Sequence, residues 1–331
     1  MLRDEVLRLL KQGDAPLSGE AMSRTLGVSR AAVWKAVEAL RQEGYTVSSA
    51  PNRGYRLEGS PDRLSAGELA GALSGRLVGR ELLYLESVDS TNSEVKRRAL
   101  AGAPEGLAVL AGEQTGGRGR RGRGFVSPAG KGLYCSVLLR PDCPFETLMQ
   151  LTAWTAVAVC DAVEAVCALR PGIKWTNDIV LQGRKLCGIL TELGMEGETA
   201  RPQYVAVGAG INVSQTGADF GPEVAPLAIS LAQALGAPPR RAELAAALLT
   251  ALDGMYAAFP HQKADWLARY RADCLTTGRP VRLLSADGRC REAFAEEIDD
   301  DFALIVRLPG GGRERVNAGE VSVRGLFGYT D

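Results

Sequence analysis

Glycines and arginines alternate almost strictly in Gly116-Gly117-Arg118-Gly119-Arg120-Arg121-Gly122-Arg123-Gly124, the most informative stretch of the chain. It lies between two apolar segments, Leu107 to Ala111 and Leu133 to Leu139, whose composition predicts strands. Glycine allows a backbone to approach a ligand closely. The planar guanidinium of arginine donates paired hydrogen bonds to carboxylate or phosphate oxygens. The stretch therefore predicts a mobile, anion-binding loop between two strands, which is typical of an enzyme.

Other interpretations of this loop have less support. Gly117, Gly119 and Gly122 match the pattern G-x-G-x-x-G, but a dinucleotide fingerprint needs a helix directly after the loop, and the sequence predicts a strand there. A kinase glycine loop lacks its accompanying catalytic motifs, and arginine-glycine RNA-binding segments lie in disordered tracts. A basic loop that is only solvated stays open for the loop taken alone.

The composition is that of a globular protein, and the length predicts two or three domains. The 331 residues are 46% hydrophobic, and Lys+Arg and Asp+Glu both total 39, so any anion site must be local. Seven cysteines without a CxxC pair indicate reduced thiols rather than a zinc site. His261 is the only histidine, which argues against Ser-His or Cys-His catalysis. The charged N-terminus is unlike a signal peptide, and no apolar run is expected to span a bilayer. These features predict a cytoplasmic protein with no membrane partner.

The first 60 residues predict a winged helix-turn-helix domain. Apolar spacing predicts a helix from Leu2 to Gln12. Ser18 is placed to cap a second helix that ends at Leu26, and Ser29 is placed to cap a third, Arg30 to Gln42. A β-hairpin with its turn near Pro51 follows. In such domains the third helix enters the major groove of DNA.

The predicted DNA contacts are therefore Ser29, Arg30 and Lys35 on the third helix and Arg53 at the hairpin tip. On the same helix, Val33, Val37 and Leu40 are expected to pack in the core, and Trp34 is left open. The alternative is a protein-binding module, because the region has only nine Lys and Arg against seven Asp and Glu.

The central region mixes strands and helices. Predicted strands are Leu82 to Val88, the two that flank the glycine-arginine loop, Ile179 to Leu181, Leu186 to Leu193 and Tyr204 to Val213. Predicted helices are Asn92 to Leu100, Leu148 to Leu169, Leu227 to Leu235 and Arg241 to Phe259. After Gly278, short strands with close turns predict a small all-β barrel, near the lower size limit for independent stability.

Three further motifs accompany the loop, and each has an ordinary structural explanation when taken alone. Ser90-Thr91-Asn92 stands at a strand-to-helix junction, where Thr91 and Glu94 have the spacing of a capping box. Lys174-Trp175-Thr176-Asn177-Asp178 could form an Asx turn. The third motif pairs Arg184 to Leu190 with Gly208 to Val213.

Together and in this order, these motifs resemble those of the biotin–protein ligases. The matching residues are Ser90-Thr91-Asn92, Gln114 with the glycine-arginine loop, Lys174 to Asp178, Lys185 to Leu190, and Gly210-Ile211-Asn212. The N-terminal domain resembles that of the bifunctional class, which is both ligase and biotin-operon repressor. The chain departs from the family at Thr176, where proline is usual, and at Asp299-Asp300-Asp301, where a glycine-containing turn is usual.

The resemblance implies an α+β multidomain protein. The expected parts are a winged helix-turn-helix at 1–60, a mixed α/β biotin- and ATP-binding domain at 61–275, and an SH3-like β-barrel at 276–331. The central domain is implied to be related to class II aminoacyl-tRNA synthetases and lipoate ligases. The implied reaction uses ATP and Mg²⁺ to convert biotin into biotinyl-5′-AMP, and then biotinylates a lysine of biotin carboxyl carrier protein. No metal site on the protein itself is implied, since Mg²⁺ enters with ATP.

The resemblance also implies roles for individual residues. Arg118, Arg120 and Lys185 are the implied catalytic cations, because two anionic reactants must meet. The implied biotin site is Ser90, Thr91, Asn92, Gln114, Arg118, Gly119, Arg120, Lys185 and Gly188. The implied adenylate site is Arg123, Trp175, Asn177, Asp178 and Asn212. Operator DNA and a ligand-dependent homodimer are the other implied partners. Two alternatives stay open: a small-molecule-sensing regulator without catalysis, and a lipoate-type ligase.

Overall fold

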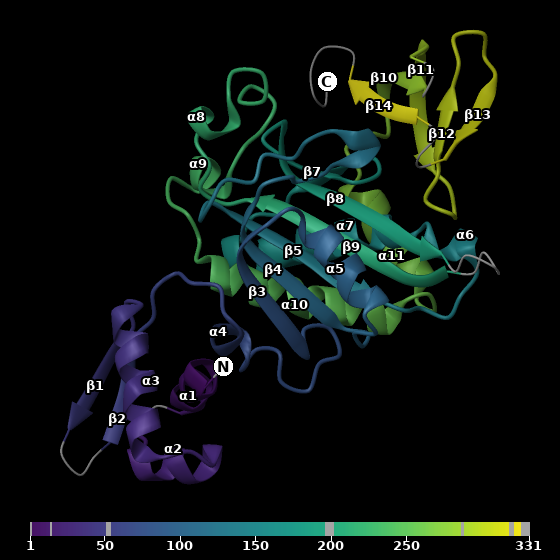
Figure 1. Cartoon of the computed structure of the whole chain (residues 1–331). Helices are drawn as coiled ribbons and strands as arrows, with labels where there is room; N and C mark the ends of the chain where they lie inside the picture. The colour runs from purple at the N-terminus through teal and green to yellow at the C-terminus, as the bar shows by residue number, and fades with distance from the viewer. Residues whose placement is uncertain are drawn as a thin grey trace.

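The structure is a computed structural model of the chain, and it describes residues 2–13, 15–50, 54–195, 202–285, 288–317 and 321–325. The chain forms a small helical unit at the N-terminus, a large α/β unit in the middle and a small β unit near the C-terminus (Figure 1). This order matches the predicted architecture. The boundaries at 60 and 275 stay predictions.

The N-terminal unit has three helices and a hairpin. These elements are α1 (Leu2–Lys11), α2 (Gly19–Leu26), α3 (Arg30–Gln42), β1 (Thr46–Ala50) and β2 (Gly54–Gly59). The hydroxyls of Ser18 and Ser29 accept hydrogen bonds from the third residues of α2 and α3, so both predicted caps are confirmed. One face of α3 carries the buried residues Val33, Val37 and Leu40, which complete the core of this unit.

The central unit is built on one sheet of seven strands. In spatial order, they are β3 (Glu81–Val88), β4 (Leu107–Gln114), β5 (Gly132–Leu139), β9 (Pro202–Asn212), β8 (Arg184–Met195), β7 (Asp178–Leu181) and β6 (Gly172–Lys174). Only β3 and β4 run parallel; the other neighbours are antiparallel. The short edge strand β6 was not predicted.

Helices cover both faces of this sheet. The helices of the central unit are α4 (Ala66–Leu69), α5 (Thr91–Leu100), α6 (Phe145–Leu148), α7 (Leu151–Cys167), α8 (Gly217–Phe220), α9 (Leu231–Leu235), α10 (Arg241–Ala258) and α11 (Lys263–Asp273). Alternate residues of β4 face opposite ways: Leu107 and Val109 pack in the cluster beneath α5, and Ala108 and Leu110 in the main core with α7 and α10. This double burial explains the unbroken apolar run in the sequence.

Two predicted helices differ from the structure. The helix expected from Leu148 to Leu169 is divided into α6 and α7. The helix expected from Leu227 is formed only from Leu231, because the backbone at Ala228 pairs with Lys185 as an isolated bridge. By length and composition, Phe145–Cys167 passes as a membrane span, contrary to the expectation of no such run. However, 67% of its apolar window is buried, as in the core helix of a folded domain.

The C-terminal unit is an antiparallel sheet of five strands. Their spatial order is β13 (Arg313–Val316), β12 (Leu304–Arg307), β11 (Cys290–Ile298), β10 (Arg279–Ser285) and β14 (Val321–Gly325). The sequence predicted short strands throughout this region, after Gly278. Within the described ranges no pairing joins the outer strands β13 and β14, so closure into a barrel by hydrogen bonds is not seen there.

The N-terminal unit is attached to the central one through α1 and α4 (Figure 1). A Cβ on Gly67 would lie 2.8 Å from the carbonyl oxygen of Asp4, so only glycine allows this approach. Beside it, the ammonium of Lys11 pairs with the carboxylate of Glu68, whose side chain is only 2% exposed. The other carboxylate oxygen, Oε1, is buried and has no hydrogen-bond partner in the part of the chain that the structure describes.

This buried carboxylate leads to a prediction about stability. Lys11→Met removes the cation while leaving Glu68 in place, so the free energy of unfolding is expected to fall by about 2 kcal/mol. Adding Glu68→Gln to that variant should restore most of the loss. Urea denaturation measures both changes. Lys35→Met, at an exposed position of α3, is the matched control and should change stability by less than about 0.5 kcal/mol. An equal loss in both single variants would contradict the assignment.

Candidate active site

A small polar cavity lies on the face of the central sheet that also carries α5. Its lining comes from the start of α5, from the ends of β4 and the glycine-arginine loop, and from β5, β8 and β9. The lining residues are Ser90, Thr91, Asn92, Gln114, Arg118, Phe125, Ser136, Gly188, Leu190, Gly208, Ala209 and Gly210. Of the predicted biotin set, the structure thus brings together Ser90, Thr91, Asn92, Gln114, Arg118 and Gly188 around one hollow.

Glycines on this face create the hollow. Even-numbered residues of β8 and β9 point to the same side of the sheet, and three of them are Gly188, Gly208 and Gly210. A Cβ on Gly208 would lie 2.3 Å from Oδ1 of Asn92, and one on Gly210 would lie 2.6 Å from the ring of Phe125. The cavity has a volume of about 30 Å³, and Phe125 forms part of its lining.

A hydrogen-bond network holds the polar side chains of the cavity. The backbone N–H and the hydroxyl of Thr91 donate to Oε1 of Gln114, at 2.9 and 3.1 Å. The amide of Gln114 donates to the hydroxyl of Ser127 at 2.9 Å. The hydroxyl of Ser136, which is fully buried in β5, lies 2.7 Å from both Thr91 Oγ1 and Asn92 Oδ1. These side chains are therefore fixed before any ligand arrives.

Helix capping does not account for the Ser90-Thr91-Asn92 motif. The helix begins at Thr91, and Ser90 makes no side-chain capping hydrogen bond. Instead the carboxylate of Asp89 accepts from the backbone N–H of Ser90. Hydrogen bonds from Arg97 hold the pKa of Asp89 at about 2, so the carboxylate is ionised at neutral pH. The side chains of Ser90 and Thr91 therefore line the cavity, and the hydroxyl of Thr91 donates to Gln114.

Asn92 is oriented by an acid that the sequence did not single out. Its amide donates to the carboxylate of Glu192 at 2.9 Å and to the carbonyl of Leu190 at 3.1 Å. Burial would raise the pKa of Glu192, but hydrogen bonds from Lys96 and Asn92 outweigh burial and lower it. The ionised carboxylate fixes the amide with Oδ1 toward Ser136 and the cavity.

The glycine-arginine loop closes against the Lys174 to Asp178 segment. A short 3-10 turn, η1 (Arg120–Gly122), carries Arg120, whose guanidinium donates to Asn177 Oδ1 at 3.0 Å and to Thr176 Oγ1 at 3.3 Å. Burial lowers the pKa of Arg120 from its ordinary value, and the charge of Asp178 opposes this. Gly119 precedes the turn and pairs with the carbonyl of Arg123, whose side chain is exposed.

A second cation approaches the cavity from β8. Nζ of Lys185 forms an ion pair with Asp178 at 2.6 Å. A Cβ on Gly188, a cavity residue, would lie 3.2 Å from this same nitrogen. Lys185 therefore stands at the rim of the cavity, and Arg118 lies in its lining. Two positive groups at one polar mouth can bind and neutralise neighbouring anions.

Trp175 and Asn212 do not line this cavity. Trp175 is 4% exposed, and its indole N–H donates to the carbonyl of Phe302 at 2.9 Å. Asn212 is also buried, and its amide donates to the carbonyls of Lys185 and Ile229 at 3.3 and 3.1 Å. Asn212 thus holds the backbone of Lys185 in place. Roles for Trp175, Asn212 and Arg123 toward an adenylate stay predictions.

The predicted DNA-contacting residues lie together on α3. Ser29 caps the helix, and Arg30, Trp34 and Lys35 are exposed on its first two turns. This first turn holds no acidic residue, unlike those of α1 and α2. Arg53, the predicted wing contact, lies outside the residues that the structure describes.

Residue reasoning missed Ser136, Phe125 and Glu192, and it placed Gly208 in a motif without giving it a role in the biotin site. One signal could have found Ser136, because it is a polar residue within the otherwise apolar run of β5. Glu192 gave no such signal, since a glutamate in a long strand is equally compatible with a solvated face. Among the described residues, no group of three or more His, Cys, Asp and Glu side chains could hold a metal ion.

Comparison with known protein families gives three matches in the same order as the structural units. The family model described as "HTH domain" matches residues 3–56. The "Biotin/lipoate A/B protein ligase family" matches residues 84–212, and the "Biotin protein ligase C terminal domain" matches 276–324.

Individual proteins are similar over nearly the whole chain. The bifunctional ligase/repressor BirA of Bacillus spizizenii is 41% identical over 94% of this chain and 95% of its own length. The Escherichia coli protein of the same name is 32% identical over 97% of this chain and 96% of its own length. The solved structure of biotin protein ligase from Aquifex aeolicus in complex with biotin and ATP is 29% identical. It covers 74% of this chain and 99% of its own, with a TM-score of 0.64.

The three glycines on the cavity side of the sheet, Gly188, Gly208 and Gly210, lead to a prediction about ligand binding. In Gly208→Ala, the new methyl group would displace the carboxamide of Asn92, so affinity for biotin is expected to fall at least about tenfold, the equivalent of one lost hydrogen bond. Titration calorimetry with biotin measures the effect. Gly254→Ala, on α10 with open space around the new atom, is the control and should keep wild-type affinity. Unchanged affinity in Gly208→Ala would show that Asn92 is not part of the binding site.

Proposed function

This chain belongs to the biotin–protein ligase family, and from that premise we propose that it activates biotin with ATP and attaches it to biotin carboxyl carrier protein. In the first step a carboxylate oxygen of biotin attacks the α-phosphorus of ATP, and pyrophosphate leaves. In the second step a lysine amine of the carrier attacks the carbonyl of biotinyl-5′-AMP, and AMP leaves as an amide forms.

One observation supports the proposal most directly. The cationic side chains of Arg118 and Lys185 lie at the mouth of a polar pocket whose side chains are held by hydrogen bonds. Thr91, Asn92 and Gln114 offer amide and hydroxyl groups suited to a neutral, polar ring such as the ureido group of biotin. Arg118 and Lys185 stand where the acid tail of such a molecule would leave the pocket. They offset the repulsion between a carboxylate and a nucleotide phosphate, which is otherwise the main barrier to the first step.

The remaining charged groups extend the site toward the nucleotide. Arg120 is held against Asn177, and Arg123 is exposed on the same loop, in a position to meet the departing pyrophosphate. Mg²⁺ supplies further positive charge on the ATP phosphates. The side chain of Asp178, now paired with Lys185, would orient that ammonium.

The glycines support a loop that closes over the reactants. A mixed anhydride reacts with water, so the site must exclude solvent until the carrier lysine arrives. Segment 214–226 lies next to β9 and is anchored by the ion pair of Lys131 with Asp219, at 2.6 Å. The hydrogen bond from Lys131, with others from Thr216, lowers the pKa of Asp219 to about 2. We assign this segment to the cover of the adenylate.

We propose that the same protein represses transcription in the cytoplasm. The N-terminal unit would bind operator DNA through α3, and a ligand-dependent homodimer would match a two-fold operator. Coupling requires that the adenylate binds the dimer-competent state more tightly than the other state. The intimate contact of α1 with α4 supports a physical connection between the two functions.

A lipoate ligase or a regulator without catalysis fits the site less well. Lipoate has no ureido group, so the network of Thr91, Asn92 and Gln114 would face a ligand without polar partners. A regulator that only binds a ligand, without catalysing a reaction, does not need a positive charge at the position of Lys185.

Incubation with ATP, Mg²⁺ and labelled biotin or lipoate tests the ligase assignment. Biotinyl-5′-AMP and a biotinylated carrier domain are expected with biotin alone. Lys185→Ala should slow adenylate formation by at least about 100-fold, since removal of one preorganised charge-stabilising group has costs of that size. Lys35→Ala, on the exposed face of α3 and outside the cavity, is the control and should keep the wild-type rate. Adenylate from lipoate, or full activity in Lys185→Ala, would contradict the assignment.

The exposed face of α3 leads to a prediction about DNA binding. Trp34 is 53% exposed, whereas Trp154, Trp175 and Trp266 are at most 7% exposed. Binding of duplexes enriched from a random pool, with biotin and ATP present, should therefore quench the fluorescence of Trp34. Lys35→Ala should reduce the slope of log affinity against log salt by about two for a bound homodimer, because it removes one phosphate contact from each α3. Failure to enrich any duplex would reject the repressor role while leaving the ligase role untouched.

A further inference from the structure

The C-terminal unit makes buried hydrogen bonds with the segment that carries Trp175. The indole N–H of Trp175 donates to the carbonyl of Phe302 at 2.9 Å, and its backbone N–H donates to the hydroxyl of Thr276 at 2.9 Å. Both acceptors belong to the region matched by the C-terminal domain family. Because all of these atoms are buried, loss of a partner would leave a polar group unsatisfied.

A second contact reaches the next residue. The ring of Phe302 packs edge-on against Tyr270 of α11, with 5.4 Å between the centroids. The hydroxyl of Tyr270 donates to the carbonyl of Thr176 at 3.4 Å. Burial raises the pKa of Tyr270, so this hydroxyl stays protonated and remains a donor. Trp175 and Thr176 are therefore both held by the turn around Phe302.

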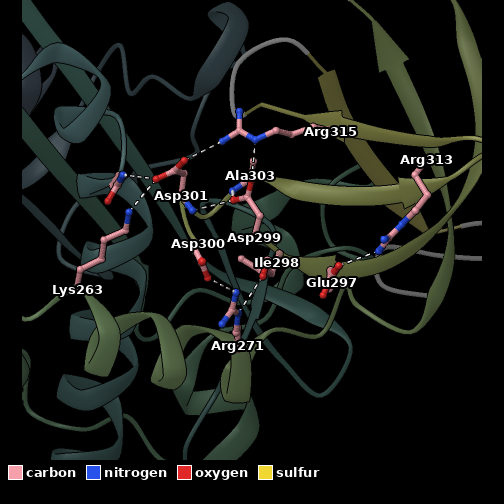
Figure 2. A network of polar contacts seen from close by, with 11 residues as sticks. Lys263, Arg271, Glu297, Ile298, Asp299, Asp300, Asp301, Ala303, Arg313 and Arg315 are labelled. Carbon is pink, nitrogen blue, oxygen red and sulfur yellow. Dashed lines mark hydrogen bonds and ion pairs between the residues drawn. The ribbon is translucent and has the colours of Figure 1, made fainter.

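The turn is built from the three aspartates that depart from the family pattern (Figure 2). Oδ1 of Asp299 accepts from the N–H groups of Asp301 and Ala303, at 2.9 and 2.8 Å. These bonds hold Phe302 at φ 63°, a left-handed conformation that is unfavourable for a bulky residue. The backbone carbonyl is thereby aimed at Trp175.

The same turn is fastened to the central unit by two cations. Asp301 pairs with Lys263 at 2.8 Å, and Asp300 with Arg271 at 3.0 Å (Figure 2). Arg271 also donates to the carbonyl of Ile298 at 2.8 Å. Because these ion pairs are exposed, each contributes little to stability. Together they fix the orientation of the turn relative to α11.

The segment that contains Trp175 and Thr176 continues to Asp178, and its residues contact the catalytic cations Arg120 and Lys185. Thr176 and Asn177 accept hydrogen bonds from Arg120, and Asp178 pairs with Lys185. A shift of Trp175 and Thr176 would move both partners at once.

We propose that the turn Asp299–Ala303 of the C-terminal unit is a positioning element of the ligase site. Through Trp175 and Thr176, it sets where Arg120 and Lys185 stand. Asp299 and Tyr270 are the positioning residues, since neither touches the cavity. The proposal rests on the ligase activity proposed above.

Single-turnover formation of biotinyl-5′-AMP, with excess enzyme over ATP, tests this role. The rate constant reports the geometry of competent molecules, and the amplitude reports how many molecules are competent. Asp299→Ala removes the acceptor that shapes the turn, so the rate constant is expected to fall about tenfold with little change in amplitude, as for a misplaced catalytic group. Asp299→Asn keeps the acceptor Oδ1 and should recover most of the rate.

Glu296→Ala is the matched control. Glu296 also accepts from two partners, Arg307 and Arg313, but both lie within the C-terminal sheet, so the rate constant should stay at the wild-type value. If Asp299→Ala does not fold, Tyr270→Phe is measured instead and should slow the reaction by removing the bond to Thr176. An unchanged rate constant with a lower amplitude, or equal slowing in Glu296→Ala, would overturn the proposal. Absence of adenylate from the unaltered protein would instead reject the ligase assignment.

Discussion

The ion pair of Lys185 with Asp178 and the hydrogen bonds of Arg120 to Thr176 and Asn177 meet in one short segment of chain. Like charges must be held close together here, because the reaction joins two anions and needs several cations. An arginine and a lysine on neighbouring elements would repel each other, and the amide and carboxylate between them make their proximity tolerable. This constraint explains why a neutral amide and an acid follow each other at 177 and 178.

The pocket beneath these cations depends on the opposite property, the absence of side chains. Gly188, Gly208 and Gly210 remove volume from one face of a sheet that is otherwise closely packed. The space is lined by groups that already have partners, such as Ser136 and Asn92, so little order has to be gained when a ligand binds. The rigid walls of the pocket therefore recognise the ligand, and the glycine-arginine loop closes over it.

Sequence patterns predicted most elements because each depends on local chemistry. The helices capped by Ser18 and Ser29 and the strands of the C-terminal sheet follow from capping residues, apolar periodicity and turns. The failures have a common cause. The start of α9 at Leu231 is set by pairing of Ala228 with Lys185, which is more than forty residues away. Strand β6 is formed by pairing with β7 and by a bridge from Ile173 to Cys274. Ser136 and Glu192 gained roles from neighbours on α5.

The sequence by itself determined the order of the units, the anion-binding character of the glycine-arginine loop and the residue types of the site, since these depend on composition and spacing along the chain. Only the packed structure shows that Trp175 faces the C-terminal sheet rather than the cavity, and that three aspartates shape the turn which contacts it. The physical reason is that the energy of a buried hydrogen bond or an ion pair depends on distances between groups far apart in the chain. Those distances exist only once the sheet and the helices have packed.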